Sequence, residues 1–336
     1  MLNVNKYSVK TLFKFWRFSL LTYFSEINLK RLEVKRFIGV DIGGTNTKIG
    51  IVTREGELVE KIKYATADLF HGEGYIKNFS AVLKEILDAN PEVKKIGIGV
   101  PGLITKDRRS LLRLANLPSL SGENLLDQLE ALLPGYEFAL ENDANAACLG
   151  ELYFSEHDLP DTFLMVTLGT GIGGAAVIDG KLFLGGNGNG VEIGHMLADE
   201  NSVYEDYISK RAMVAYVKKK LEKEKYHKSK LADIDSNELT AKHIEAAVKE
   251  KDILAKKAYA NFGKWLGKNL VSSMRVLDIN TILLGGGVSK TFKYMEGPMM
   301  EEIHTYLGEY YTKDLTIQKA SLKNEAGIIG AASLNF

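Results

Sequence analysis

Two segments that lie far apart in the sequence share one pattern: a strand-like run, a turn rich in glycine and threonine, and a second strand-like run. They are VDIGGTNTKIG (40–50) and VTLGTGIGGAAV (166–177). The β-branched and apolar residues on both sides of each turn favour strands, so each segment is predicted to form a hairpin. A hairpin that occurs twice indicates a duplicated α/β unit, in which each copy offers one loop to an anion.

Each turn is suited to phosphate because glycines let backbone N–H groups approach an anion closely. We expect Gly43 and Gly44 to supply the positive φ angles of a tight hairpin. The second turn matches G-x-G-x-x-G through Gly169, Gly171 and Gly174. However, strand-like residues follow this match, whereas a dinucleotide fingerprint runs into a helix. The chain also has no GxxxxGK[ST] loop, so neither common nucleotide fingerprint is present.

One glycine hairpin alone is equally typical of a plain surface turn. Two such hairpins, with a third glycine cluster at Gly285–Gly287 after a buried strand, favour phosphate binding. A phosphate between two hairpins would be held from both sides, as phosphoryl transfer requires.

Composition narrows the class of protein. The 336 residues are 45% hydrophobic and 26% charged with zero net charge, which is typical of a globular protein of one large or two medium domains. Zero net charge gives no bulk attraction to nucleic acid. The single cysteine, Cys148, allows no disulfide within the chain, and no apolar run reaches the roughly 18 residues of a spanning helix. We expect a cytoplasmic protein without a membrane or nucleic-acid partner.

Residues 1–36 differ from the rest, with eight Lys or Arg residues against two glutamates and several aromatic residues. A basic arm that binds a membrane surface or nucleic acid is one interpretation. Lys14 and Arg17 interrupt the apolar run, which argues against a signal peptide. We favour an extension that lies outside the folded core.

Beyond residue 37, strand-like and helical patterns alternate. Helices are predicted at 122–133, directly after the polar turn at 141–143, over most of 205–270, and at 324–334. Residues 279–290 read as a buried strand that ends in three glycines before a further helix. We assign residues 37–154 plus 322–336 to a small domain, and residues 155–321 to a large domain.

Seven short motifs occur in an order that resembles the ROK family, whose members are sugar kinases and sugar-responsive repressors. The motifs are DIGGTNTKIG (41–50), GVPGLI (99–104), NLP (116–118), ENDANAACLGE (141–151), LGTGIGGAAVIDG (168–180), VEIGH (191–195) and LLGGGVS (283–289). The resemblance spans residues 37–336 and implies an α/β, two-domain actin-like ATPase fold (ribonuclease H-like) with duplicated βα units.

The resemblance also implies roles for individual residues. Asp143 resembles the general base that takes the proton of a sugar hydroxyl; a helix N-cap is its structural alternative. Asp41 resembles the residue that faces Mg²⁺ through water. The sugar-binding positions would be Gly102, Asn116, Asn142, Glu192, His195 and Glu205. The ATP-binding positions would be Gly43, Gly44, Thr45, Asn46, Lys48, Gly169, Thr170, Gly171, Gly173, Gly285, Gly286 and Gly287.

One departure from the family concerns zinc. Many members follow the Gly-His pair with a cysteine cluster that binds a structural zinc, but residues 196–204 (MLADENSVY) contain no cysteine. A closed zinc site needs four ligands, so no zinc is expected. The loop after His195 must be held in another way, and this leaves the alignment of Glu205 open.

The resemblance implies an ATP- and Mg²⁺-dependent, glucokinase-like hexose kinase that forms a homodimer and binds a small sugar and a nucleotide. Three alternatives stay open: a sugar-sensing repressor, a polyphosphate-dependent hexokinase, and an actin-like scaffold. The sequence does not choose between glucose and related hexoses or hexosamines.

Overall fold

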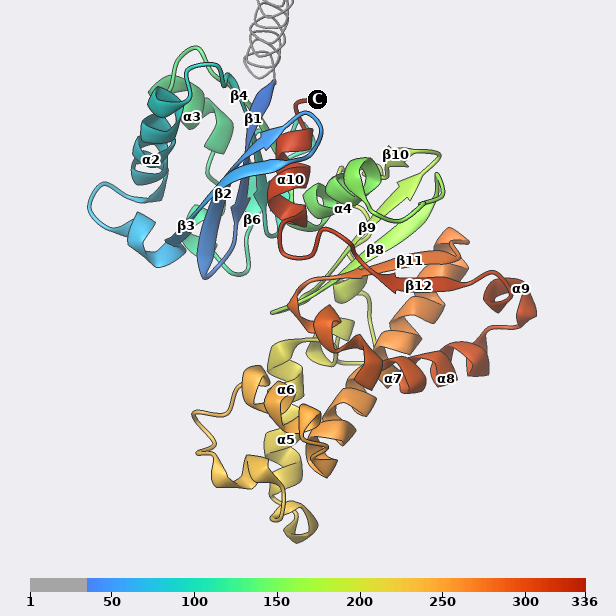
Figure 1. The fold of residues 1–336 in the computed structure, drawn as a ribbon. Helices are drawn as coiled ribbons and strands as arrows, with labels where there is room; N and C mark the ends of the chain where they lie inside the picture. Colours follow the sequence, from blue (N-terminus) through green and yellow to red (C-terminus); the bar gives the residue numbers. More distant parts are fainter. Residues whose placement is uncertain (1–34) are drawn as a thin grey trace, which may run out of the picture.

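A computed structural model describes residues 35–336 of the chain as an α/β protein built around two five-stranded sheets (Figure 1). The predictions for residues 1–34 lie outside the described residues. The first sheet contains β1 (Arg36–Ile42), β2 (Asn46–Thr53), β3 (Leu58–Ala65), β4 (Lys95–Val100) and β7 (Glu137–Asn142). The second contains β8 (Phe163–Leu168), β9 (Ile172–Ile178), β10 (Lys181–Leu182), β11 (Thr281–Gly285) and β12 (Thr316–Lys319).

The two sheets have the same topology. Their strand orders are β3-β2-β1-β4-β7 and β10-β9-β8-β11-β12, and in each the first three strands are antiparallel and the last two add in parallel. Each glycine-rich turn therefore connects the centre strand of a sheet to its antiparallel neighbour. This arrangement confirms the predicted duplication and places the two hairpins at equivalent points of the two sheets.

Helices cover both faces of each sheet. They are α2 (Tyr75–Ala89), α3 (Leu125–Leu132), α4 (Asp143–Phe154), α5 (Lys210–Leu221), α6 (Ala241–Lys249), α7 (Ile253–Leu277), α8 (Glu296–Tyr306), α9 (Glu309–Thr312) and α10 (Ala326–Ser333). On its outer face, the first sheet packs with α2 and α3 to form one hydrophobic core. The second sheet packs with α5, α6, α7 and α8 to form another. A short hairpin of β5 (Leu103–Ile104) and β6 (Leu111–Arg113) follows β4.

Helices α4 and α10 lie between the two sheets (Figure 1). Small residues make this close packing possible: a Cβ at Gly97 of β4 would lie 1.7 Å from the carbonyl oxygen of Ala331, and one at Gly330 would lie 1.6 Å from that of Ala146. Backbone therefore packs directly on backbone at this junction. The same helix α4 carries Asp143 at its first position, so the junction positions the candidate catalytic residue.

Two further observations complete the fold. No helix within residues 35–336 is both long and apolar enough to cross a membrane. The segment after the third glycine cluster forms a 3-10 helix, Gly287–Tyr294, with a kink at Thr291. Other 3-10 helices are Thr66–Phe70, Pro118–Leu120, Ile193–His195, Tyr204–Asp206, Glu224–Tyr226 and Lys230–Asp233.

Candidate active site

Residues from both halves of the chain line one cleft with a volume of about 390 Å³. The predicted site residues that line it are Gly43, Gly44, Gly102, Asn116, Asn142, Asp143, Gly169, Thr170, Gly171, Gly173, Glu192, His195, Glu205 and Gly286. The predicted residues that are not among its lining are Asp41, Thr45, Asn46, Lys48, Gly285 and Gly287. The cleft thus joins both glycine hairpins to all six of the predicted sugar-binding residues.

The first hairpin turn is closed by its own backbone. The Gly43 N–H donates to the Asn46 carbonyl at 3.0 Å, and the Thr66 hydroxyl donates to the Gly43 carbonyl at 2.6 Å. The expectation of positive φ angles here was wrong, because neither Gly43 nor Gly44 has one. Glycine instead leaves room, since a Cβ at Gly44 would lie 3.1 Å from the Cβ of Asn116.

Asp41 and Lys48 face each other across this hairpin. They are direct partners in the β1–β2 register, and the Lys48 ammonium forms a salt bridge with the Asp41 carboxylate. Within residues 35–336 no cluster of three or more His, Cys, Asp or Glu side chains could enclose a metal ion. Mg²⁺ commonly uses only one or two carboxylates, together with water and substrate phosphates. Asp41 at the edge of a phosphate loop therefore fits a magnesium ion that arrives with a nucleotide.

Asp143 is the first residue of α4, and Asn142 is the cap of that helix. The Asn142 side-chain oxygen accepts from the N–H groups of Ala144 at 2.8 Å and Asn145 at 3.2 Å. The capping role considered for Asp143 thus belongs to its neighbour. Burial raises the pKa of Asp143 to about 7, and the carboxylates of Asp41 and Glu192 add to this increase. A carboxylate with a pKa near neutrality is well matched to general-base catalysis.

Asn142 also ties β7 to the β4–β5 connection. Its side-chain amide donates to the Gly102 carbonyl at 3.1 Å. Gly102 has a φ of 109°, and a Cβ there would lie 2.3 Å from the Arg113 carbonyl oxygen, so this position requires glycine. Both ends of the Asn142 side chain thus have protein partners, and these bonds leave its second amide proton unused.

Glu192 and His195 lie together at the cleft. The His195 Nδ1 and a Glu192 carboxylate oxygen are 2.9 Å apart. Glu192 is at the centre of an inverse γ-turn, with φ −72° and ψ 57° and a 2.7 Å bond from the Ile193 N–H to the Val191 carbonyl. Val191 itself has a φ of 64°, which is unusual for a β-branched residue and indicates local strain directly before Glu192.

Glu205 contacts the second hairpin. Its carboxylate accepts from the Ile172 N–H at 3.2 Å, and a Cβ at Gly171 would lie 2.0 Å from the same oxygen. Glu205, whose alignment the missing cysteines left open, therefore lies in the lining of the cleft. Arg211, in the first turn of α5, also lines the cleft, although no motif in the sequence pointed to it.

The loop after His195 is held without a zinc cluster. Leu197 and Val203 form an isolated antiparallel bridge, which makes residues 196–204 a small hairpin. The Tyr207 hydroxyl donates to the Asp199 carboxylate. The Tyr207 ring stacks on Trp265 of α7 with ring centres 3.9 Å apart and planes 13° apart. The residues of this loop lack the cysteines of such a site, and a hydrogen bond and an aromatic stack connect the loop to α7 instead.

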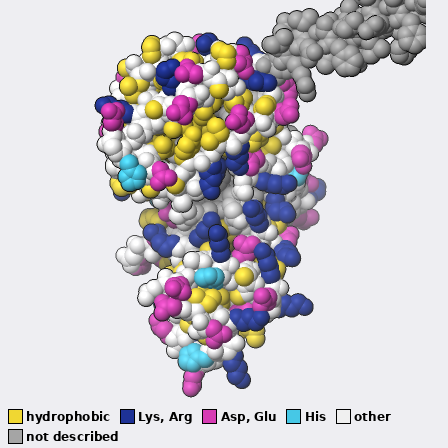
Figure 2. Space-filling view, turned by 60° about the vertical axis from the view of Figure 1, so that its left-hand side comes forward, with side chains coloured by type: hydrophobic (Ala, Val, Ile, Leu, Met, Phe, Trp, Pro, Cys, Tyr) yellow, Lys and Arg dark blue, Asp and Glu magenta, His cyan; other side chains and the backbone are white. Residues whose placement is uncertain are grey.

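The third glycine cluster packs against the second hairpin. Gly286 has a φ of 78°, and a Cβ there would lie 2.4 Å from the Leu168 carbonyl oxygen. Lys210, at the start of α5, donates its backbone N–H to the Gly169 carbonyl at 3.2 Å. Figure 2 shows lysine and arginine side chains gathered along the waist between the two halves. Positive charge at this position favours an anionic donor.

Comparisons with known proteins agree with this geometry. The family model described as ROK family matches residues 37–335. A glucokinase of Thermotoga maritima is 30% identical over 311 residues, which cover 89% of this chain and 96% of that protein. The crystal structure of a Streptomyces griseus ROK family glucokinase with glucose and AMPPNP superposes with a TM-score of 0.77 at 30% identity, covering 89% and 98% of the two chains. A Cytophaga hutchinsonii protein assigned as a sugar kinase gives a TM-score of 0.81 at 39% identity, covering 89% and 99%.

Proposed function

Because this chain belongs to the ROK family, we propose that it is an ATP-dependent hexose kinase with Asp143 as its general base. The observation that carries the proposal is a carboxylate with a pKa of about 7 in a cleft lined by two glycine hairpins. Such a group is ionised often enough at neutral pH to accept a hydroxyl proton, and it is basic enough to hold one.

In the proposed reaction, the sugar oxygen attacks the γ-phosphorus of ATP. The O–H proton passes to the Asp143 carboxylate, a bond forms between the sugar oxygen and phosphorus, and the bond to the β-phosphate oxygen breaks. ADP and a sugar phosphate result, and Asp143 later releases its proton to water. Asp41 would hold the magnesium ion of the nucleotide through water, and this ion supplies charge neutralisation to the transferred group.

The remaining residues would position the two substrates. Glu192 and His195 form a joined pair with oxygen and nitrogen atoms directed at the cleft, which suits neighbouring sugar hydroxyls. The two hairpin turns would offer backbone N–H groups to the phosphates. Asn142 contributes its remaining amide proton. These roles are assigned from the position of each residue in the cleft.

A sugar-sensing repressor is the alternative within the same family, and ROK regulators share this fold. Glucokinases among the relatives of at least 29% identity, and the near-neutral pKa of Asp143, favour the enzyme. A repressor needs sugar binding only, so it has no use for a base at this position.

The proposal is tested with purified protein, a panel of hexoses and hexosamines, and either ATP or polyphosphate as donor. We expect Mg²⁺-dependent phosphorylation with ATP, with glucose or a related hexose as the preferred acceptor. Asp143→Asn should lower kcat by about 10²–10⁴-fold while sugar affinity by calorimetry stays within a few-fold. Tyr153→Phe, at an exposed position near the far end of the same helix, serves as a control for general disturbance of α4. Near wild-type turnover in Asp143→Asn would rule out the assigned base.

A further inference from the structure

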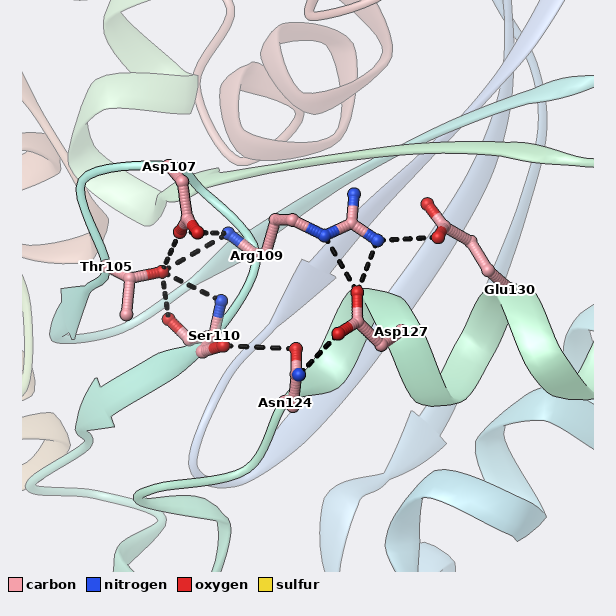
Figure 3. Close-up of polar contacts among 7 residues, drawn as sticks. All are labelled: Thr105, Asp107, Arg109, Ser110, Asn124, Asp127 and Glu130. Atoms are coloured by element: carbon pink, nitrogen blue, oxygen red, sulfur yellow. Dashed lines mark hydrogen bonds and ion pairs between the residues drawn. The ribbon is translucent and has the colours of Figure 1, made fainter.

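Two adjacent arginines in the turn between β5 and β6 have different surroundings. Arg109 points to α3, where its guanidinium binds Asp127 and Glu130 (Figure 3). The Thr105 hydroxyl accepts from the N–H groups of Arg109 at 3.3 Å and Ser110 at 3.0 Å, which closes the turn. Arg109 therefore anchors the turn to its own domain, at the molecular surface.

Arg108 turns inward instead. Its backbone has a φ of 59°, and its guanidinium lies 3.3 Å from the carboxylate of Glu141 at the end of β7. The two side chains are only 17% and 5% exposed. Within residues 35–336, both terminal nitrogens of Arg108 are buried without a hydrogen-bond partner of good geometry. A buried charge pair with unused donors is costly, so it suggests a role other than stability.

The partner carboxylate holds the start of the candidate catalytic helix. One oxygen of Glu141 faces Arg108, and the other accepts from the Asn142 N–H at 2.8 Å and from the Asn145 side-chain amide at 3.0 Å. Asn142 directly precedes Asp143, and Asn145 follows it by two residues. Glu141 thus connects the Arg108 charge to the backbone that orients the base.

Arg108 also meets the loop of the second half that leads to Glu192. A Cβ at Gly188 would lie 3.2 Å from a terminal nitrogen of Arg108, and the backbone of Gly188 has a φ of 85°, which favours glycine. Next to it, the Asn189 side chain accepts from the Ile104 N–H at 3.0 Å and donates to the Ile104 carbonyl at 2.8 Å. The β5–β6 turn and this loop are therefore joined across the two halves.

We propose that Arg108 is a positioning residue for the phosphoryl transfer: through Glu141 it fixes the Asn142–Asp143 corner and couples it to the loop at Gly188. The inference rests on the proposed kinase function. Arg108 touches neither substrate. It neutralises Glu141, so that this buried carboxylate can hold the corner in one conformation. Its unused donors face the loop that must be in place when sugar is bound.

The first test is a set of variants measured for kcat and for the KM of each substrate. Arg108→Met should lower kcat by about tenfold or more and raise the sugar KM, because a small misplacement of a catalytic group is enough for such a loss. The KM for ATP should stay within about twofold, since the phosphate loops are held elsewhere. Arg108→Lys keeps the charge and should lose less. Arg109→Met is the matched control: the turn keeps its hydrogen bonds to Thr105 and the Arg108–Glu141 pair, so all three parameters should stay near wild type.

A double variant separates charge from packing. Glu141→Gln keeps an oxygen for the Asn142 N–H, so Arg108→Met/Glu141→Gln removes both charges and keeps the bond. We expect the double variant to recover most of the kcat that Arg108→Met loses. If it is no better than Arg108→Met, the loss comes from packing alone and the proposal is wrong.

Amide hydrogen exchange tests the proposal with a readout that does not depend on enzyme activity. Arg108→Met should speed exchange at Asn142 and in the first turn of α4, and also at residues 184–190. Arg109→Met should speed exchange only in the β5–β6 turn and α3. An inactive wild-type protein would refute the kinase function but leave this measurement valid. Unchanged exchange at Asn142, or equal losses of kcat in both arginine variants, would overturn the role of Arg108.

Discussion

Asp143 shows how the surroundings of one side chain set its chemistry. An ordinary aspartate would be fully ionised at neutral pH and a weak base. At the mouth of α4, burial disfavours the charged form, and the nearby carboxylates of Asp41 and Glu192 disfavour it further, so the pKa rises to about 7. As the proposed base, Asp143 must be ionised to act, so activity should be lost on the acid side of this value.

We therefore expect kcat/KM for the sugar to fall as pH drops below about 7, approaching tenfold per pH unit, and to level off above it. Initial rates from pH 5.5 to 9 at saturating ATP and Mg²⁺ measure this profile. The residual activity of Asp143→Asn should lack the same acid limb. An acid limb near pH 4 in the wild type, or one that persists in the variant, would mean that another group titrates.

Val191 is a second residue whose local conformation matters, because its backbone has a positive φ. A β-branched side chain at φ 64° costs on the order of 1–2 kcal/mol, and its carbonyl accepts the bond that shapes the turn at Glu192. Glycine would remove the strain but also the partly buried side chain. Because these effects oppose each other, Val191→Gly should change the free energy of unfolding by less than about 1 kcal/mol.

Val177→Gly provides the comparison, because Val177 is fully buried in the regular strand β9. That change should destabilise the protein by about 2–4 kcal/mol, from lost burial and added backbone freedom. Urea denaturation of both variants measures the difference. Equal destabilisation would show that Val191 is unstrained in solution.

At the scale of elements, the sequence was most informative where the pattern of apolar residues and the spacing of glycines agree. The paired hairpins, the helix after Asn142, and the closing helix α10 were all predicted and are present. The reason for individual glycines was not predictable. Gly44 is needed beside Asn116, and Gly97 beneath Ala331, and both neighbours come from distant parts of the chain. Spacing shows where glycine occurs, but only the packed fold shows what approaches it.

The same limit applies to the candidate site. Motif residues such as Asp143 and Glu192 could be selected from local sequence. Arg108 and Arg211 could not, because no local pattern marks an arginine that meets a partner from another strand or lines a cleft. Tyr207 and Trp265 are likewise far apart in the chain, so their stack was invisible until the fold brought them together.

The hairpin at 196–204 gives a test at this scale. Trp265→Leu removes the stack on Tyr207, and Tyr207→Phe removes the bond to Asp199. Because this hairpin lies between His195 and Glu205, both changes should raise the sugar KM, by about three- to tenfold for Trp265→Leu, if a stack of this kind contributes on the order of 0.5–1.5 kcal/mol. The KM for ATP should not change.

A zinc chelator should leave the activity and melting temperature of the wild type unchanged, provided that Mg²⁺ is replenished. Stoichiometric zinc in the purified protein, or a large loss of stability with the chelator, would show that the hairpin depends on a metal. An unaltered sugar KM in both variants would show that the stack does not hold the sugar loop.

For the whole molecule, the cleft draws its walls from both halves, while α4 and α10 form the layer between the sheets. The domain limits near residues 154 and 322 and the homodimer stay predictions; α4 packs on both sheets, so it does not mark a boundary between them. Light scattering on the purified protein would measure its oligomeric state.

Domain closure is the expected motion of this architecture. Asn116, Asn142 and Asp143 come from the first half of the chain, and Glu192, His195 and Glu205 come from the second, so a sugar that contacts both sets would draw the halves together. Closure excludes water, which otherwise competes with the sugar hydroxyl for the γ-phosphate. The contact of Asn189 with Ile104 already joins the halves at one point, and the motion should pivot near it.

Small-angle scattering should therefore give a smaller radius of gyration with saturating sugar than without it, measured on the same oligomer. An analogue of the preferred sugar that lacks the attacking hydroxyl should promote the same closure and stimulate slow ATP hydrolysis, because water can then enter the vacant position. Glu205→Gln, which weakens one wall of the cleft, should reduce both effects together. If calorimetry confirms sugar binding and the radius stays constant, either the cleft is already closed without sugar or the assigned set of sugar-binding residues is wrong, and sugar-driven closure is ruled out.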